Sequence, residues 1–330
     1  MKVIVTGGTG YIGSHTCVEL IKKGHEIVII DNLSNSKADV VDKIEKITGK
    51  RPVFYDADIL DRNKIDKIFA ANKVDAVIHF AGKKAVGESV EKPLMYYYNN
   101  ITGTINILES MLKNGCTKFV FSSSATVYGA PKTVPIKEDF PLSTANPYGT
   151  TKLYIEGILQ DLYKANKELS ITILRYFNPI GAHQSGLIGD NPNGIPNNLM
   201  PYITRVAKGE LKQLRVFGND YPTHDGTGVR DYIHVVDLAN GHIKAIENME
   251  NPDLRIYNLG TGKGYSVLDI VKAFKKATDI DIPYVITERR PGDIAECFAD
   301  ASKAKRELGW QTEYVLEDMC RSAWNFERNA

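Results

Sequence analysis

The chain has 330 residues, of which 43% are hydrophobic and 25% are charged, and its net charge is +1. This composition is typical of a globular protein with room for one large domain or two interleaved ones. The sequence has no basic stretch and no apolar run long enough to span a bilayer. We therefore expect no nucleic-acid partner, no membrane partner and no signal peptide.

The spacing of the histidines and cysteines gives two expectations, one about metal binding and one about the cellular compartment. The seven histidines show no spacing typical of metal ligands, so we expect no metal. The four cysteines are widely spaced and form no Cys-x-x-Cys pair, which favours a reducing cytoplasm over a disulfide framework.

The first predicted element is a strand at residues 2–6, a β-branched run that should be buried on both faces. Apolar residues at helical spacing then predict a helix over 12–23, and Gly7, Gly10 and Gly13 lie in the turn between them and at the helix start. Glycines allow the backbone to approach a ligand closely, and a helix N-terminus offers free N–H groups. This arrangement predicts a pyrophosphate site, although glycines needed only for the turn are the alternative.

Asp31 follows the second predicted strand, at residues 26–30. It lies at about the distance where a carboxylate binds the 2′-hydroxyl of a ribose in dinucleotide-binding folds. A carboxylate at that point would repel a 2′-phosphate. Asp31 therefore supports the dinucleotide interpretation and favours NAD over NADP.

Strands and helices continue to alternate along the first half of the chain. We expect strands at residues 52–55, 76–80, 119–122 and 171–175, and helices at 61–71, 93–113 and 147–167. This alternation predicts an α/β fold with a Rossmann-type doubly wound parallel sheet.

The second half of the chain has a more mixed pattern. We expect residues 1–178 to form an NAD-binding Rossmann domain and residues 179–330 to form a smaller mixed α/β substrate-binding part. A helix over 235–248 and a strand over 255–259 suggest that residues 229–260 return to the first sheet.

Tyr148 and Lys152 lie one turn apart on a predicted helix that begins with Pro147. Ser124 ends a serine run after a buried strand, at the edge of the sheet where ligands of such folds bind. A phenol held beside a lysine can take a proton while a dinucleotide takes a hydride. These residues therefore predict oxidation of an alcohol carbon on a nicotinamide cofactor.

The Tyr-x-x-x-Lys spacing alone is not specific, since it occurs twice more in the chain. Tyr128 and Lys132 flank Gly and Pro and should lie in a turn. Tyr163 and Lys167 come late on a predicted helix, where a solvated surface pair is the better interpretation.

Longer motifs are more specific and run nearly from end to end. On them the chain resembles the UDP-glucose 4-epimerases, also called UDP-galactose 4-epimerases, of the extended short-chain dehydrogenase/reductase superfamily. The motifs are Val5–His15, His79–Gly82, Ala85–Ser89, Phe121–Gly129, Leu174–Asn178, Gly194–Pro201, Phe217–Pro222 and Gly226–His234.

Position by position, the resemblance implies a complete site. It implies catalytic roles for Ser124, Tyr148 and Lys152. With the glycines above, the expected NAD contacts are Gly7, Gly10, Tyr11, Ile12, Gly13, Asp31, Asn32, Asn35, Ser36, Asp58, Ile59, Phe80, Ala81, Lys84, Asn99 and Phe177. The expected contacts to a UDP-sugar are Asn178, Asn198, Leu199, Phe217, Arg230, Arg290, Asp293 and Cys297.

The implied reaction is reversible epimerisation of UDP-glucose and UDP-galactose at C4, through a 4-keto sugar that turns about an anchored UDP. Tyr148 would be the base, although a free tyrosine has a pKa of about 10. Lys152 and the positive nicotinamide ring would both favour its phenolate, and Ser124 would hydrogen-bond the same substrate oxygen. Arg230 and Arg290 suit a diphosphate, because a guanidinium offers paired donors.

The resemblance places the family's sugar-pocket gate at Cys297. A bulky tyrosine there excludes 2-acetamido sugars in such enzymes, so the small cysteine predicts activity on UDP-N-acetylglucosamine and UDP-N-acetylgalactosamine as well. The alternative is a buried cysteine that only packs as a small apolar residue.

Two other functions are alternatives to an epimerase. A nucleotide-sugar 4,6-dehydratase would need an acid and a carboxylate base directly after the active-site hydroxyl, but Ala125 and Thr126 follow Ser124. A non-catalytic NAD-binding sensor would not need intact Ser124, Tyr148 and Lys152.

The superfamily commonly forms homodimers through a four-helix bundle, and we expect the same from the helices over 93–113 and 147–167. The alternative is that their apolar faces only cover the sheet. The faces are formed by Leu94, Ile101, Ile105, Leu108 and Met111 on one helix and by Leu153, Ile158, Leu159 and Leu162 on the other.

Overall fold

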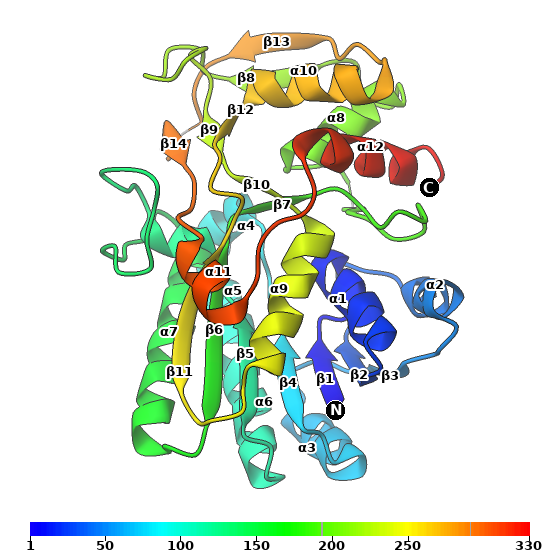
Figure 1. Ribbon diagram of the computed structural model, residues 1–330, viewed down its shortest axis with the longest axis vertical. Coiled ribbons are helices and arrows are strands. Elements are labelled where there is room, and N and C mark those ends of the chain that lie inside the picture. Colours follow the sequence, from blue (N-terminus) through cyan, green and yellow to red (C-terminus); the bar gives the residue numbers. More distant parts are fainter. Residues whose placement is uncertain (193, 291) are drawn as a thin grey trace.

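A computed structural model describes residues 1–192, 194–290 and 292–330. At its centre lies a seven-stranded sheet in the order β11-β6-β5-β4-β1-β2-β3, with every neighbouring pair parallel (Figure 1). The doubly wound α/β prediction is confirmed. The strands are β1 (Lys2–Thr6), β2 (Glu26–Asp31), β3 (Val53–Asp56), β4 (Ala76–His79), β5 (Lys118–Ser122), β6 (Ser170–Tyr176) and β11 (Leu254–Leu259).

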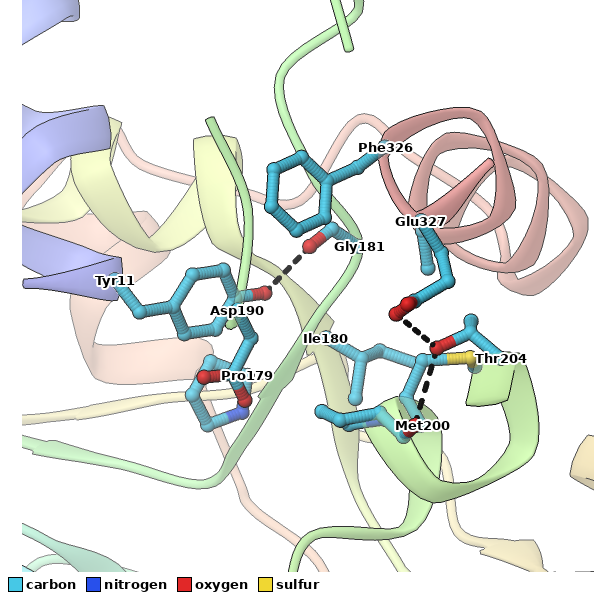
Figure 2. A pocket seen from close by; sticks show the side chains of 11 residues that line it. Tyr11, Pro179, Ile180, Gly181, Asp190, Met200, Thr204, Phe326 and Glu327 are labelled. Carbon is cyan, nitrogen blue, oxygen red and sulfur yellow. Dashed lines mark hydrogen bonds between the residues drawn. The ribbon is translucent and has the colours of Figure 1, made fainter. Parts of the chain in front are cut away.

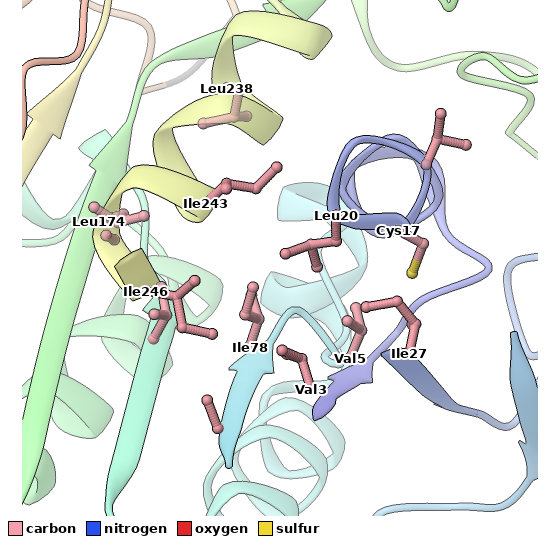
Figure 3. Close-up of a cluster of buried hydrophobic side chains, with 14 of the residues drawn as sticks. Val3, Val5, Cys17, Leu20, Ile27, Ile78, Leu174, Leu238, Ile243 and Ile246 are labelled. Carbon is pink, nitrogen blue, oxygen red and sulfur yellow. The ribbon is translucent and has the colours of Figure 1, made fainter. Parts of the chain in front are cut away.

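A hydrophobic core lies on each face of the sheet, and alternate residues of a strand point to opposite faces. Val3 and Val5 of β1 belong to one core cluster, whereas Ile4 belongs to the other. In the first cluster, Leu20 of α1 and Ile243 of α9 pack on the strands (Figure 3). The helices of this face are α1 (Tyr11–Lys22), α2 (Asp39–Thr48), α9 (Val235–Glu247) and α11 (Ser302–Leu308), and those of the other face are α3 (Arg62–Asn72), α6 (Gly103–Lys113) and α7 (Pro147–Ala165).

The segment from α9 to β11 lies against the sheet although it comes late in the chain. β11 pairs with β6 in parallel, from Leu254 opposite Ile171 to Leu259 opposite Tyr176. It is therefore an edge strand of the central sheet. The division into a cofactor domain at 1–178 and a substrate part at 179–330 stays a prediction.

The remaining C-terminal elements pack around a separate core, which includes Met200, Ile203, Phe274 and Met319. In Figure 1 this part lies above the central sheet. Its helices are α8 (Leu199–Ala207), α10 (Val267–Thr278) and α12 (Leu316–Glu327), and its small sheets are β8 (Leu214–Phe217) with β13 (Tyr284–Thr287), β7 (Asn178–Ile180) with β10 (Tyr232–His234), and β9 (Val229–Arg230) between β12 (Tyr265–Ser266) and β14 (Glu296–Cys297).

The helix predicted over 93–113 is interrupted. α5 (Pro93–Tyr97) passes into the π-helix η1 (Tyr98–Thr102) before α6 begins, and the short α4 (Val86–Glu91) precedes them. Within η1, the side chain of Asn100 bonds to the backbone of Lys83 and to Thr151 rather than facing solvent. Single π-turns of this kind are frequent at functional sites. No helix within the described residues is long and apolar enough to cross a membrane.

Candidate functional site

The order in which strands are added to the sheet reverses between β1 and β4. The chain adds β2 and β3 on one side of β1, and it adds β5 and β6 on the other side, beyond β4. Ligands of doubly wound folds bind outside the carboxyl ends of the strands at this point. The glycine-rich turn lies there. Gly7 has a φ of 70°, and a Cβ added to Gly13 would lie 2.2 Å from the Gly7 carbonyl oxygen. Both positions therefore require glycine.

The N-terminus of α1 is suited to an anion. Its N-cap is Gly10, no side chain caps it, and its first turn contains no acidic residue. The first N–H groups of a helix have no partner within the helix, so at α1 they are available to a phosphate. Tyr11 and Ile12 are the first residues of α1, and the Tyr11 hydroxyl donates to the Gly181 carbonyl across a small pocket that Asp190 also lines (Figure 2).

Asp31 joins the turn to the segment that follows β2. Its carboxylate accepts from the Thr9 N–H at 3.1 Å, from the Leu33 N–H at 3.0 Å and from the Ser36 hydroxyl at 3.2 Å. Leu33 has a left-handed φ of 57°, a conformation that its bond to Asp31 helps to hold. Two residues predicted to bind the cofactor, Asp31 and Ser36, are thus brought together.

The next predicted contacts continue along the same edge. The Asn32 amide donates to Asp58 at 2.9 Å, and Asn35 lies between Asn32 and Ser36 in the same segment. Ile59 is buried, and its side chain packs so closely on Gly103 that a Cβ there would lie 2.3 Å away. Only 5% of Ile59 is exposed, so little of its side chain is accessible to a ligand.

Phe80, Ala81 and Lys84 follow β4, on the other side of the glycine-rich turn. The Ala81 nitrogen would lie 2.8 Å from a Cβ on Gly7, so the two segments are in close contact. Asn99 lies in η1, next to Asn100. Asn100 accepts from the Lys83 N–H at 2.8 Å and donates to the Lys83 carbonyl and to the Thr151 hydroxyl, each at 3.0 Å.

The three predicted catalytic residues meet at the end of β5. Ser124 lies directly before the short 3-10 helix η2 (Ala125–Tyr128), and its hydroxyl is near enough to Tyr148 to lower the pKa of that phenol. The Lys152 ammonium donates to the Ser122 carbonyl at 2.7 Å. Tyr148 and Lys152 lie on the buried face of α7, whose N-terminus is capped by Asn146.

Electrostatics at this site do not favour the phenolate by themselves. Burial raises the pKa of Tyr148, the nearby phenol of Tyr176 raises it further, and the hydrogen bond from Ser124 lowers it. Burial lowers the pKa of Lys152 to about 8, with the negative charge of Glu156 acting in the opposite direction. The expectation that Lys152 favours the phenolate therefore depends on a further positive charge beside the phenol.

The predicted substrate residues form two pairs in the C-terminal part. One pair joins β9 to the segment before β14: Arg230 lies 3.8 Å from the Asp293 carboxylate and donates to the Ile294 carbonyl at 2.9 Å. In the other, the Arg290 guanidinium carbon lies 3.8 Å from the centre of the Phe217 ring, a cation–π contact. Both pairs bring a guanidinium to the same region.

Three further residues predicted to contact the substrate lie at the starts of α8 and β7. Asn198 immediately precedes α8, Leu199 begins it, and the Asn198 amide donates to Asp190 at 3.3 Å. Asn178 begins β7 with an exposed side chain.

Cys297 and Phe177 are buried in one apolar cluster. Val127 is a buried member of the cluster, and Ala125 packs against it. Both residues belong to the turn that follows Ser124. Cys297 thus shares an apolar cluster with the turn at residues 125–128, which we call the catalytic turn.

The sequence analysis missed four polar residues that organise the site: Asn100, Glu156, Arg175 and Asp231. Asp231 is fully buried and accepts from both the N–H and the hydroxyl of Thr261, and from the N–H groups of Gly262 and Ala299. It thus ties β11 and β14 to the arginine strand β9. Two of these residues could have been found from sequence position. Asp231 directly follows Arg230, and Glu156 comes four residues after Lys152.

Within the described residues, one group of possible metal ligands lies close together: His224, Asp225 and Asp269, with ligand atoms within 4.8 Å of one another. Ser266 donates to both carboxylates, through its hydroxyl to Asp225 at 2.5 Å and through its N–H to Asp269 at 3.0 Å. The group is accounted for as the N-terminal cap of α10.

Comparison with known proteins gives full-length matches. The family described as GDP-mannose 4,6 dehydratase matches residues 4–323. A UDP-glucose 4-epimerase from Bacillus subtilis is 62% identical over 99% of this chain and 97% of its own length.

Two solved UDP-glucose 4-epimerases have nearly the same structure. The protein from Stenotrophomonas maltophila, with bound NAD and formylated UDP-arabinopyranose, has a TM-score of 0.98 at 52% identity, and the match covers 100% of this chain and 98% of that one. The protein from Bifidobacterium longum, in complex with NAD+ and UDP, has a TM-score of 0.97 at 53% identity with the same coverage. Sequence, fold and site geometry agree, and the chain belongs to the family of the UDP-glucose 4-epimerases.

Proposed function

We propose that the protein is an NAD-dependent isomerase that interconverts UDP-glucose and UDP-galactose by epimerisation at C4. The observation that carries this is the meeting of Ser124, Tyr148 and Lys152 at the carboxyl edge of the sheet, beside the glycine-rich turn. Cys297, from the part that holds Arg230 and Arg290, shares an apolar cluster with the catalytic turn.

The residues fit NAD. Gly7 and Gly13 leave no space for a side chain, and the uncapped N-terminus of α1 can receive the pyrophosphate. Asp31 can accept the ribose hydroxyls, and its charge disfavours a 2′-phosphate. When bound, NAD supplies the hydride acceptor for C4 and the hydride donor that restores it.

Tyr148 is the proton acceptor for the 4-hydroxyl of the sugar. Burial keeps its phenol protonated, so a positive charge beside it is needed to lower its pKa. The Lys152 ammonium carries such a charge, and a bound oxidised nicotinamide ring would add to it. Tyr148 would then hold the proton while the 4-keto sugar exists. Ser124 positions the same oxygen, and the proton returns with the hydride.

Epimerisation requires that the 4-keto sugar present its other face before the hydride returns. A UDP held firmly, with a sugar held weakly, allows this turn. Arg230 and Arg290 provide charge for the diphosphate, and Asn198 provides an amide at the start of α8. The same anchoring keeps the intermediate from leaving.

The chain lacks the acidic residues that a dehydratase would need directly after Ser124. Ser124 is followed by Ala125 and Thr126, which enter the 3-10 helix η2. No carboxylate therefore stands directly after the hydroxyl, where elimination of water would need one. The family description that mentions a dehydratase does not alter this, since residues and not fold decide the reaction.

The assembly is a homodimer formed through the outer faces of α5, η1, α6 and α7. The apolar residues of these helices divide into two sets. Leu108, Met111 and Leu159 are buried against the sheet, whereas Leu94 is 81% exposed and Ile105 is 37% exposed. Tyr98 and Tyr154 add exposed rings at 63% and 54%, so these helices expose several large apolar side chains that a second copy could cover.

The enzyme works in the cytoplasm. All four cysteines are buried as free thiols, which suits a reducing compartment.

The pocket also admits 2-acetamido sugars. Cys297 is 9% exposed and packs with Phe177 and Val127 beside the catalytic turn. Burial raises the pKa of its thiol to about 11, so it acts as a small neutral side chain. This supports turnover of UDP-N-acetylglucosamine and UDP-N-acetylgalactosamine.

Tyr148→Phe removes the base and leaves the ring packing in place. We expect a fall in kcat of about 10² to 10⁴, the range for loss of a general acid–base group, with bound NAD unchanged. Epimerisation of UDP-galactose and the absorbance of bound cofactor measure both effects. Tyr163→Phe, the matched control on the same helix, should retain wild-type kcat; comparable activity in the two variants would remove Tyr148 from this role.

Asp31→Ala removes the acceptor for the ribose hydroxyls. Hydrogen bonds to charged groups contribute about 1.5–3 kcal/mol, so we expect NAD affinity to fall about tenfold to a hundredfold. The measurement is NAD content after purification, followed by titration. Asp61→Ala, which removes the N-cap of α3, is the control for general destabilisation. Equal NAD content in the two variants would show that Asp31 only orders its own turn.

Cys297→Tyr should abolish turnover of UDP-N-acetylgalactosamine by steric overlap with the acetamido group while sparing UDP-galactose. Cys297→Ser, which stays small, should retain both activities. Turnover of each substrate by the three proteins measures the effect. Absence of acetamido activity in the wild type would contradict the gate.

Leu94→Glu combined with Tyr154→Glu should convert the homodimer to a monomer, because it places charges in an apolar interface. Light scattering gives the mass. Val285→Glu, at an exposed apolar position on β13, is the control and should remain dimeric. A monomeric wild type at working concentration would contradict the proposal.

A further inference from the structure

Three consecutive serines at the end of β5 contact three residues on one face of α7. The α7 residues are spaced four apart, so their side chains form a stripe along the helix. Lys152 donates to the Ser122 carbonyl at 2.7 Å, and the Ser123 hydroxyl donates to Glu156 at 2.5 Å. Ser124 lies near Tyr148 and lowers the pKa of its phenol. The Tyr148–Lys152 stripe thus continues to Glu156, which the reaction itself does not use.

Glu156 is one half of a buried ion pair with Arg175 of β6. Their side chains are 0% and 2% exposed. Arg175 approaches with two nitrogens: Nη2 donates to Oε2 at 2.6 Å, and Nε lies 3.1 Å from Oε1 and 3.2 Å from Oε2. Burial opposes the charge of Arg175, but the hydrogen bonds and charge of Glu156 raise its pKa overall. Removing either partner would leave a buried charge unpaired.

Hydrogen bonds connect the Glu156–Arg175 ion pair to two further segments near the catalytic turn. Arg175 donates to the Tyr128 hydroxyl and to the Glu138 carbonyl, each at 3.0 Å. The Tyr128 hydroxyl then donates to Asn258 of β11 at 2.7 Å. A single buried network therefore connects α7, the ends of β5 and β6, the strand β11, and the η2 turn directly after Ser124.

We propose that Glu156 and Arg175 are positioning residues for the reaction. Through the Ser123 hydroxyl they hold the serine run in register with Tyr148 and Lys152. Proton transfer needs the oxygens of Ser124 and Tyr148 on the same substrate atom, and a misplacement of about 1 Å can reduce a rate about a hundredfold. This inference rests on the proposed function, because it concerns the same proton transfer.

Ser123→Ala tests this proposal, because it removes the hydrogen bond from Ser123 to Glu156 and leaves the Glu156–Arg175 ion pair intact. The matched control is Ser110→Ala: Ser110 is also fully buried and also donates to a carboxylate, that of Asp66, but it lies on α6 away from the site. Both variants should lose similar thermal stability. For each protein, kcat and KM for UDP-galactose are measured per bound NAD, so that only folded, loaded enzyme is counted.

We expect Ser123→Ala to lower kcat about tenfold to a hundredfold with KM within about twofold, and Ser110→Ala to keep both at wild-type values. Equal kcat in the two variants would overturn the positioning role. A raised KM with unchanged kcat would also overturn it, since the network would then serve substrate binding. These outcomes all require an active wild type, whereas an inactive wild type would instead contradict the proposed function.

Discussion

The site depends on the packing of α7 against the end of β5. Two elements that are predicted separately meet there through the serine run and the Tyr148–Lys152 stripe, and no cofactor contact is needed to describe the fit. The sheet sets the position of β5, because its strands are buried on both faces and cannot shift register without exposing a core face. The asparagine cap, with Pro147 at the first helical position, sets the start of α7.

The electrostatics of this packing divide the chemical task between protein and cofactor. Burial raises the pKa of Tyr148 and lowers that of Lys152. The buried phenol of Tyr148 therefore stays protonated near neutral pH. A bound oxidised nicotinamide ring would add a positive charge that favours the phenolate, and loss of that charge on reduction would favour the protonated phenol. Under the proposed function, the proton and the hydride would leave and return together, as an enzyme that reverses its own oxidation requires.

Local signals predicted most of the fold. The β-branched strands form the central sheet, and Asp31 at the end of β2 accepts from the Thr9 N–H of the glycine-rich turn. The roles predicted for these site residues stay predictions. The sequence did not reveal Asp231, whose partners come from residues 261, 262 and 299. Nor did it reveal the Glu156–Arg175 pair or the π-turn at Asn100. These features arise from contacts between segments that are distant in sequence, which periodicity and spacing do not encode.

The central claim is that one hydride leaves C4 and returns to C4 of the same sugar within the site. The most direct measurement uses UDP-galactose that carries deuterium at C4, with the label followed in product and solvent. The account predicts UDP-glucose with the deuterium still at C4, none in water and no net reduced cofactor released. Loss of the label to solvent, or release of reduced cofactor in proportion to product, would contradict it.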